Sequence, residues 1–316
     1  MIVLGYMDST KSKVISLTEC IKHDINEDPD TQVKKNGFGA LSIIRKASVA
    51  SAHLEFGFLS ESNLGTLRKY MNNRNYPKKI FFAEPGNTTA QYFDHTSVTN
   101  PSSTQTAHWL KAAAATSNPT AIKAGTEFST NNYTSINTDD TNTFEITNTD
   151  QAFTNILLGF KVSTWVTLNT DIATARLALK RLTLFLSNLE MFDGSTQGYT
   201  ISVWDSAATT PAWVEIGRRY YHIAGTVASG YVVQNTFAVR PLDGFTDYGA
   251  LINSDHDIFF KISNIVARTG TLTTRLNYAS LLINGYGCSW VNEDNFTYQE
   301  AFTGAGFTGT MELLET

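Results

Sequence analysis

The stretch YTISVWD (residues 199–205) decides the fold class, because apolar and polar side chains alternate along it. This alternation is typical of a β-strand that has one face buried. A turn at residues 207–211 leads to WVEIG (213–217), which predicts a second strand. Together the two stretches predict a β-hairpin. The alternating apolar residues of its first strand are Tyr199, Ile201 and Val203.

Short apolar runs separated by polar turns continue on both sides of this hairpin, from residue 120 to residue 290. Several short strands in succession indicate a sandwich or a jelly roll. We therefore predict an all-β fold with one or two short helices, in which residues 120–290 form a jelly-roll β-sandwich. Further strands are expected at 143–146, 156–162, 182–186, 258–262 and 276–283.

Residues 1–95 predict a smaller β-rich domain that serves in assembly and contains one helix. In the stretch SESNLGTLRKYMNN (60–73), three apolar residues recur at helical spacing. Ser60 or Ser62 can cap the N-terminus of this helix. We expect the helix to lay its apolar side chains on the sheet and to support assembly. These three residues are Leu64, Leu67 and Met71.

The rest of this domain is expected to consist of strands and one long loop. In HLEFGFL (53–59), the apolar residues Leu54, Phe56 and Phe58 are expected on one face of a strand. Residues 24–39 are polar and contain proline and glycine, which predicts a loop. The other predicted strands are 14–17, 40–45 and 79–83.

Two segments are expected outside the compact domains. Residues 96–119 are rich in Ser, Thr and Asn and predict a linker, whose Ala-rich part forms a short helix packed through Trp109. Residues 291–316 are rich in Gly and Thr and predict an arm that becomes ordered against a neighbouring subunit. The predicted boundaries are therefore 1–95, 96–119, 120–290 and 291–316.

Composition and charge exclude several classes of function. Charged residues make up 17% of the 316 residues, below the roughly 25% of an average soluble protein. The formal net charge is −5, and no basic cluster is denser than Lys78–Lys79 or Arg218–Arg219. Because a nucleic-acid interface needs a basic patch, we expect no nucleic-acid partner.

Cysteine usage and hydropathy indicate a protein made in the cytoplasm. Cys20 and Cys288 are the only cysteines, and we expect them to be reduced thiols. The N-terminal stretch MIVLGYMDSTK lacks the basic start and apolar length of a signal peptide. No window approaches the roughly 18 apolar residues of a membrane helix. We therefore expect no membrane partner.

Short motifs indicate no catalytic or cofactor site. GAGFTG (304–309) matches the dinucleotide-binding pattern GxGxxG, but too few residues follow it for the helix that such a site needs. NSDHD (253–257) offers metal ligands, although a polar turn before the next strand explains it better. We expect no catalytic residue, no cofactor, no metal and no enzymatic activity. Paired carboxylates of a glycan-cleaving enzyme stay open as an alternative, because they can come from distant positions.

Five aromatic residues gather around the predicted hairpin. Exposed aromatic rings there could stack on a sugar of a host surface, whereas buried ones would fill a core or a subunit interface. We favour the core or interface role. The five residues are Tyr199, Trp204, Trp213, Tyr220 and Tyr221.

Two parts of the sequence resemble known families. The stretch ASVASAHLEFGFLSESNLGTLRKYMNNRNYPKKIFFAEPG (47–86) resembles the first domain of the distal tail (baseplate hub) proteins of long-tailed phages, in which a strand, a helix and a strand follow in this order. YTSINTDDTNTFEI (133–146), YTISVWDSAATTPAWVEIG (199–217) and DIFFKISNIVARTGTLTTRLNYASLLINGYG (257–287) are similar to the galactose-binding type of jelly roll found in phage structural proteins. No ligand-binding residue of that type has a match here.

This resemblance implies a structural component of a phage particle, made in the host cytoplasm and located in the virion. The implied place is the tail tip or baseplate, where the protein joins the tail tube to receptor-binding parts. The implied partners are further copies of itself in a ring and other virion proteins. A carbohydrate-binding adhesin and a capsid decoration or fibre-base protein are the alternatives.

Overall fold

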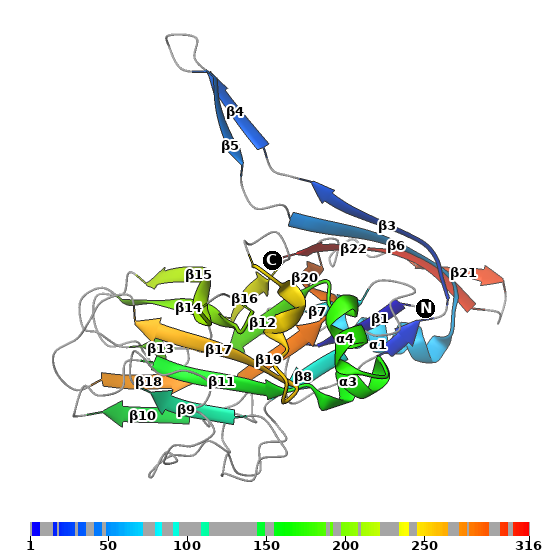
Figure 1. The fold of residues 1–316 in the computed structure, drawn as a ribbon. Helices are drawn as coiled ribbons and strands as arrows, with labels where there is room; N and C mark the ends of the chain where they lie inside the picture. Colours follow the sequence, from blue (N-terminus) through cyan, green and yellow to red (C-terminus); the bar gives the residue numbers. More distant parts are fainter. Residues whose placement is uncertain are drawn as a thin grey trace. The chain divides into compact units, whose positions relative to one another are not determined.

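The computed structural model describes residues 2–6, 15–17, 19–28, 31–35, 41–45, 49–71, 80–83, 91–94, 109–113, 144–148, 155–187, 190–191, 197–207, 210–221, 234–239, 245–264, 272–276, 278–290, 298–302 and 306–315. Within them the chain is mostly strands in antiparallel sheets, with three short α-helices and one 3₁₀ helix (Figure 1). This confirms the predicted all-β fold class. The contacts divide the chain into two compact units, one formed by residues 1–7, 12–88 and 286–316 and the other by residues 8–11 and 89–285.

The first unit is built on an eight-stranded sheet and one helix, α1 (Glu61–Met71). Separately, β4 (Thr31–Lys35) and β5 (Leu41–Arg45) form a two-stranded hairpin between β3 and β6 in the sequence. The eight strands run in the order β2 (Ile15–Leu17), β1 (Ile2–Tyr6), β7 (Ile80–Ala83), β20 (Gly285–Trp290), β22 (Gly306–Glu315), β6 (Val49–Leu59) and β3 (Cys20–Asp28), with β21 (Tyr298–Phe302) paired to β22 off this path.

Helix α1 packs on this sheet as the sequence predicts. Its N-cap is Ser60, whose Oγ accepts a hydrogen bond from the Asn63 N–H at 3.2 Å. Leu64 and Leu67 are buried in one apolar cluster with side chains of β6, β20 and β22. The other buried members of this cluster are Leu4, Ala50, Ala52, Leu54, Phe56, Leu59, Tyr286, Cys288, Met311 and Leu313.

The second unit contains two sheets that share one core, which is the arrangement of a β-sandwich. The first has the strand order β15 (Ala212–Tyr221), β14 (Gln197–Asp205), β17 (Asp257–Asn264), β11 (Asn155–Lys161) and β9 (Trp109–Ala113). The second has the order β16 (Gln234–Val239), β12 (Leu182–Ser187), β19 (Tyr278–Ile283) and β8 (Gln91–Asp94). A further small sheet joins β10 (Phe144–Asn148), β18 (Leu272–Leu276) and β13 (Glu190–Met191).

The hairpin predicted at 199–217 is confirmed: β14 and β15 pair antiparallel, with Trp204 directly opposite Trp213. The predicted alternation along β14 is also confirmed, because its apolar side buries Tyr199, Ile201 and Val203 in the core. Gly217 lies where the ring of Phe237 crosses β15, and a Cβ at Gly217 would come within 2.5 Å of that ring.

Three short helices occur in the second unit where only strands were expected. They are α3 (Ser163–Leu168), α4 (Ile172–Ala178) and the 3₁₀ helix η4 (Tyr248–Leu251). Asp171 caps α4, because its carboxylate accepts the Thr174 N–H at 2.8 Å. This hydrogen bond lowers the pKa of Asp171. Trp165 and Val166 anchor α3 in the sandwich core.

Two predicted segments are wrong. The loop predicted at 24–39 contains the end of β3, which runs to Asp28, and all of β4. The helix predicted around Trp109 is strand β9, which pairs with β11. Apolar and polar residues do not alternate clearly in polar strands or in an Ala-rich strand. Such segments are therefore recognised as strands only from the distant strands with which they pair. Residues 96–108 and 114–119 of the predicted linker lie outside the described residues.

The division into units also differs from the predicted boundaries. Strands β8 and β9, from a segment assigned to the first domain and the linker, pair with β19 and β11 of the second unit. Strands β21 and β22, from the segment predicted to be an arm, belong to the sheet of the first unit. Both differences have one cause: strands join through backbone hydrogen bonds to remote partners, which local composition does not reveal.

Two substitutions in α1 should have opposite effects on stability. Leu67→Ala should lower the free energy of unfolding by about 2–5 kcal/mol, because it opens a cavity in the buried cluster. Gly65→Ala should raise it by about 0.5–1 kcal/mol, because alanine is the better helix former and, apart from the helix's own backbone and the adjacent residues, no atom lies within 4 Å of the added Cβ. Urea unfolding followed by circular dichroism would measure both. Equal effects of the two variants would contradict the packing of α1.

Gly217→Ala should destabilise the second unit by about 1–3 kcal/mol, because the added methyl group overlaps the buried Phe237 ring. Phe237→Leu in the same chain should recover part of that loss, because the smaller side chain vacates the space. Thermal unfolding of the single and double variants measures this coupling. Strictly additive effects would show that the two residues do not touch.

Candidate functional site

One face of the first unit's sheet is a candidate contact surface, which we call the outer face. It consists of the side chains of β3, β6 and β22 that point away from the buried cluster. Along β6, Leu54 is buried while its neighbours His53 and Glu55 are only partly buried. Along β22, Met311 is buried while Glu312 is exposed. The register places Asp24 of β3 and Glu312 of β22 on either side of His53.

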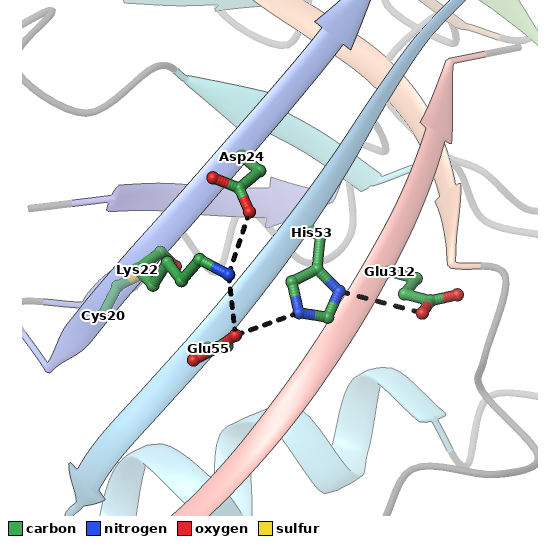
Figure 2. A network of polar contacts seen from close by, with 6 residues as sticks. All are labelled: Cys20, Lys22, Asp24, His53, Glu55 and Glu312. Carbon is green, nitrogen blue, oxygen red and sulfur yellow. Dashed lines mark hydrogen bonds and ion pairs between the residues drawn. The ribbon is translucent and has the colours of Figure 1, made fainter.

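A network of polar contacts crosses the three strands on this face (Figure 2). Lys22 Nζ lies 3.1 Å from Asp24 Oδ2 and donates a hydrogen bond to Glu55 Oε1 at 3.2 Å. His53 Nε2 lies 3.4 Å from the same Glu55 oxygen, and His53 Nδ1 lies 3.7 Å from Glu312 Oε1. The hydrogen bonds to Asp24 and Glu55 raise the pKa of Lys22. The network holds three carboxylates and one lysine, so it is acidic.

Because these groups are exposed, the network contributes little to folding. The side chains of Lys22, Asp24 and Glu312 are about half exposed, and solvent screens ion pairs between exposed side chains, so they add little to the free energy of unfolding. The network is therefore not a main source of the stability of the sheet. The face thus presents three carboxylates, those of Asp24, Glu55 and Glu312, which are linked through Lys22 and His53.

Large apolar side chains are exposed beside this network. Ile21 is 70% exposed and its side chain lies over Gly57, where an added Cβ would meet it at 3.1 Å. Leu314 is 40% exposed and follows Glu312 on the same side of β22. The register of β3 against β6 shifts between Cys20 and Lys22, so Ile21 occupies a bulge.

Phe58, at the end of β6, departs from the predicted alternation. It was expected on the buried side with Leu54 and Phe56, but it is 56% exposed. The physical reason is its backbone: φ is 60°, in the left-handed region that bulky residues rarely adopt. Gly306 (φ 133°) lies against the backbone of Phe58, where a Cβ would come within 3.1 Å of it. Strain of this kind is often found at functional surfaces.

Strand β3 also gives the sheet an open edge. It is nine residues long and stands last in the strand order, paired to β6 on one side. In the part of the chain that the structure describes, no strand pairs with its other side. The backbone N–H and C=O groups of such an edge can accept a strand from another chain.

The residues predicted for the assembly helix have a different place. Leu64 and Leu67 are buried in the first unit's cluster, so they hold the sheet from inside and are not available to a partner. Met71 is the last residue of α1, and its side chain lies outside the described residues.

The predicted aromatic residues divide between core and surface. Tyr199 belongs to the sandwich core and packs edge-on against Phe237. Trp204 and Trp213 lie on the opposite side of the same sheet, half-buried and in contact. Tyr220 and Tyr221 end strand β15, and their side chains lie outside the described residues.

The motif at 253–257 forms a turn. The side-chain oxygen of Asn253 accepts the N–H groups of Asp255 and Asp257, both at 2.9 Å. His256, with φ 65°, completes the turn into β17. Among the described residues, no group of three or more His, Cys, Asp or Glu is placed to hold a metal ion. Gly306 and Gly309 of the GxGxxG match lie within β22.

Both cysteines are free thiols, and burial raises the pKa of Cys20. In the described ranges no helix has the length and apolarity needed to cross a membrane.

A scan against models of known protein families finds no match to this chain, and a search of curated proteins also finds none.

The outer face could be foreseen only in part. The alternation His53-Leu54-Glu55 indicates which side chains of β6 face outward. Their neighbours on β3 and β22 could not be predicted, because part of β3 falls in the segment predicted as a loop and β22 falls in the segment predicted as an arm. The left-handed backbone at Phe58 has no signal in the sequence.

Phe58→Asn should leave the free energy of unfolding unchanged or raise it by up to about 1 kcal/mol, because asparagine tolerates the left-handed region. Phe56→Ala, two residues away and buried, should lower it by about 3–5 kcal/mol. Denaturant unfolding measures both. A large loss of stability in Phe58→Asn would show that the Phe58 ring holds the fold together.

Proposed function

We propose that this protein is a structural subunit of a tailed-phage particle, located in the tail tip or baseplate, where it joins the tail tube to receptor-binding parts. The observation that carries the proposal is the outer face with its open edge: a long strand, β3, unpaired on one side within the described residues, beside exposed apolar side chains. The described residues form an extended, partly apolar surface on a β-sheet, and such a surface fits assembly better than turnover.

The element order of the first unit supports the resemblance to distal tail proteins. That resemblance requires a strand, a helix and a strand in succession, and β6, α1 and β7 follow in this order. Helix α1 then packs on the sheet through Leu64 and Leu67.

A ring is the assembly that this sheet supports best. Its two ends, β2 and β3, are different surfaces, so a contact between the edge of one copy and another surface of the next is heterologous. Heterologous contacts form a closed ring when the rotation between subunits closes. The partners in this proposal are further copies of the chain and other proteins of the virion.

The second unit is, in this proposal, a jelly roll of the galactose-binding type that projects from the ring or serves as a spacer. Two sheets with one shared core support it. The antiparallel hairpin β14–β15, on which the resemblance rests, supports it as well.

The oligomeric state of the full chain tests the proposal. Light scattering after size exclusion, with electron microscopy of the peak, should show a ring. Ile21→Lys should shift the ring toward monomer without loss of folding, because Ile21 is 70% exposed and a lysine beside an edge strand discourages pairing.

Leu177→Lys is the matched control. Leu177 is 77% exposed on α4 of the second unit, so the same change of chemistry is made at a residue that is not part of the outer face. It should leave the ring intact. A wild-type chain that stays monomeric at every concentration would refute the ring, and equal effects of the two substitutions would refute the assigned surface.

A further inference from the structure

The second unit carries an aromatic patch that the proposed function does not use. We call it the tryptophan patch; it consists of Trp204, Trp213 and Lys261. Trp204 follows the buried Val203 in β14, so alternation turns it away from the sandwich core. Trp213 lies directly opposite Trp204 on β15. Lys261 comes from β17, the other neighbour of β14.

The two indole rings are held in a fixed arrangement. Their centroids lie 5.1 Å apart and their planes meet at 63°, an edge-to-face pair. Both rings pack against a small apolar cluster formed by Leu157 and Phe259, which are buried on this side of the sheet. Both tryptophans are themselves half-buried. A ligand would therefore meet ordered aromatic surface and lose little affinity to side-chain ordering.

The charge beside these rings is not neutralised. Lys261 Nζ lies over the Trp213 ring at 5.0 Å from its centroid, a cation–π contact, and no carboxylate among the described residues pairs with it. The nearest acidic residue in the same row of the sheet is Glu215, opposite Ser202, which in turn faces Lys261. Glu215 is held by Arg218 through two contacts of 3.1 and 3.0 Å. Partial burial lowers the pKa of Lys261, and an anion placed beside it would offset that cost.

These features define the chemistry of a ligand. Indole faces bind the C–H face of a pyranose ring, because its polarised C–H bonds point at the negative π surface. A half-buried ammonium that has no carboxylate partner favours binding of a ligand that carries a carboxylate. We infer that the tryptophan patch binds a sugar residue that carries a carboxylate, such as a uronic or sialic acid within a polysaccharide. The inference is independent of the ring, since its test measures ligand binding and not oligomeric state.

Matched pairs of probes test the inference on the full chain. Oligogalacturonate is compared with its methyl ester, and sialyllactose with lactose, by titration calorimetry and tryptophan fluorescence. At least one acidic member should bind and change the fluorescence, while its neutral partner should bind about tenfold more weakly, because it lacks the charged contact. Failure of all four probes to bind at millimolar concentration would overturn the inference.

Lys261→Met separates a binding site from a purely structural tryptophan pair. It removes the charge while keeping an unbranched side chain of similar length, and it should abolish the preference for the acidic probe, with about a tenfold loss of affinity. Lys180→Met, at an exposed lysine that follows α4, is the control. It should change neither the affinity nor the preference for the acidic probe. If Lys261→Met binds the acidic probe as well as the wild-type chain does, the assignment is wrong. Trp213→Ala should lose binding of both members of each pair, and retained binding would equally overturn the assignment.

Discussion

The pairing of β22 with β6 is the contact on which the first unit depends. In this register Met311 lies opposite Leu54 and Leu313 lies opposite Ala52, and all four side chains are buried in the cluster beneath α1. The Glu315 carboxylate accepts the Ala50 N–H at 3.0 Å across 265 positions of sequence. Without β22, β6 would lose the backbone hydrogen bonds on one of its two sides. Helix α1 would also lose part of the apolar surface on which it packs. Loop-closure entropy grows only with the logarithm of loop length, so a sheet can include a partner this distant.

The same pairing determines where the sheet ends. Because β22 occupies one side of β6, β3 pairs with the other side, and its outer edge has no partner within the described residues. Lys22 and Asp24 place charges along this edge, which opposes uncontrolled pairing with other strands. Ile21 and Phe58 have the opposite character, because each exposes apolar surface at a bulge or a strained backbone. The edge region therefore combines charges that oppose nonspecific strand pairing with exposed apolar surface.

Sequence alone predicted the elements whose side chains follow a clear period. Strand β14 was predicted because Tyr199, Ile201 and Val203 alternate with polar residues. Helix α1 was predicted because Leu64, Leu67 and Met71 recur every three to four positions. Strands β3, β9 and β22 were missed for a common reason. Their sequences are polar, Ala-rich or Gly- and Thr-rich, and their strand character comes from remote backbone partners. The domain boundaries failed with them, because those strands decide which segments share a sheet.

The candidate sites show where prediction from sequence reaches its limit. Alternation fixes the face on which a side chain lies, so burial of Tyr199 implies that Trp204 faces away from the core. It does not fix the neighbours, which depend on strand order and register. Trp204 meets Trp213 within one hairpin, but Lys261 joins them only because β17 pairs with β14. His53 likewise meets Glu312 only because β22 pairs with β6. A site assembled across strands is therefore a property of the sheet's topology, and the topology is held by long-range pairs that no short stretch of the sequence contains.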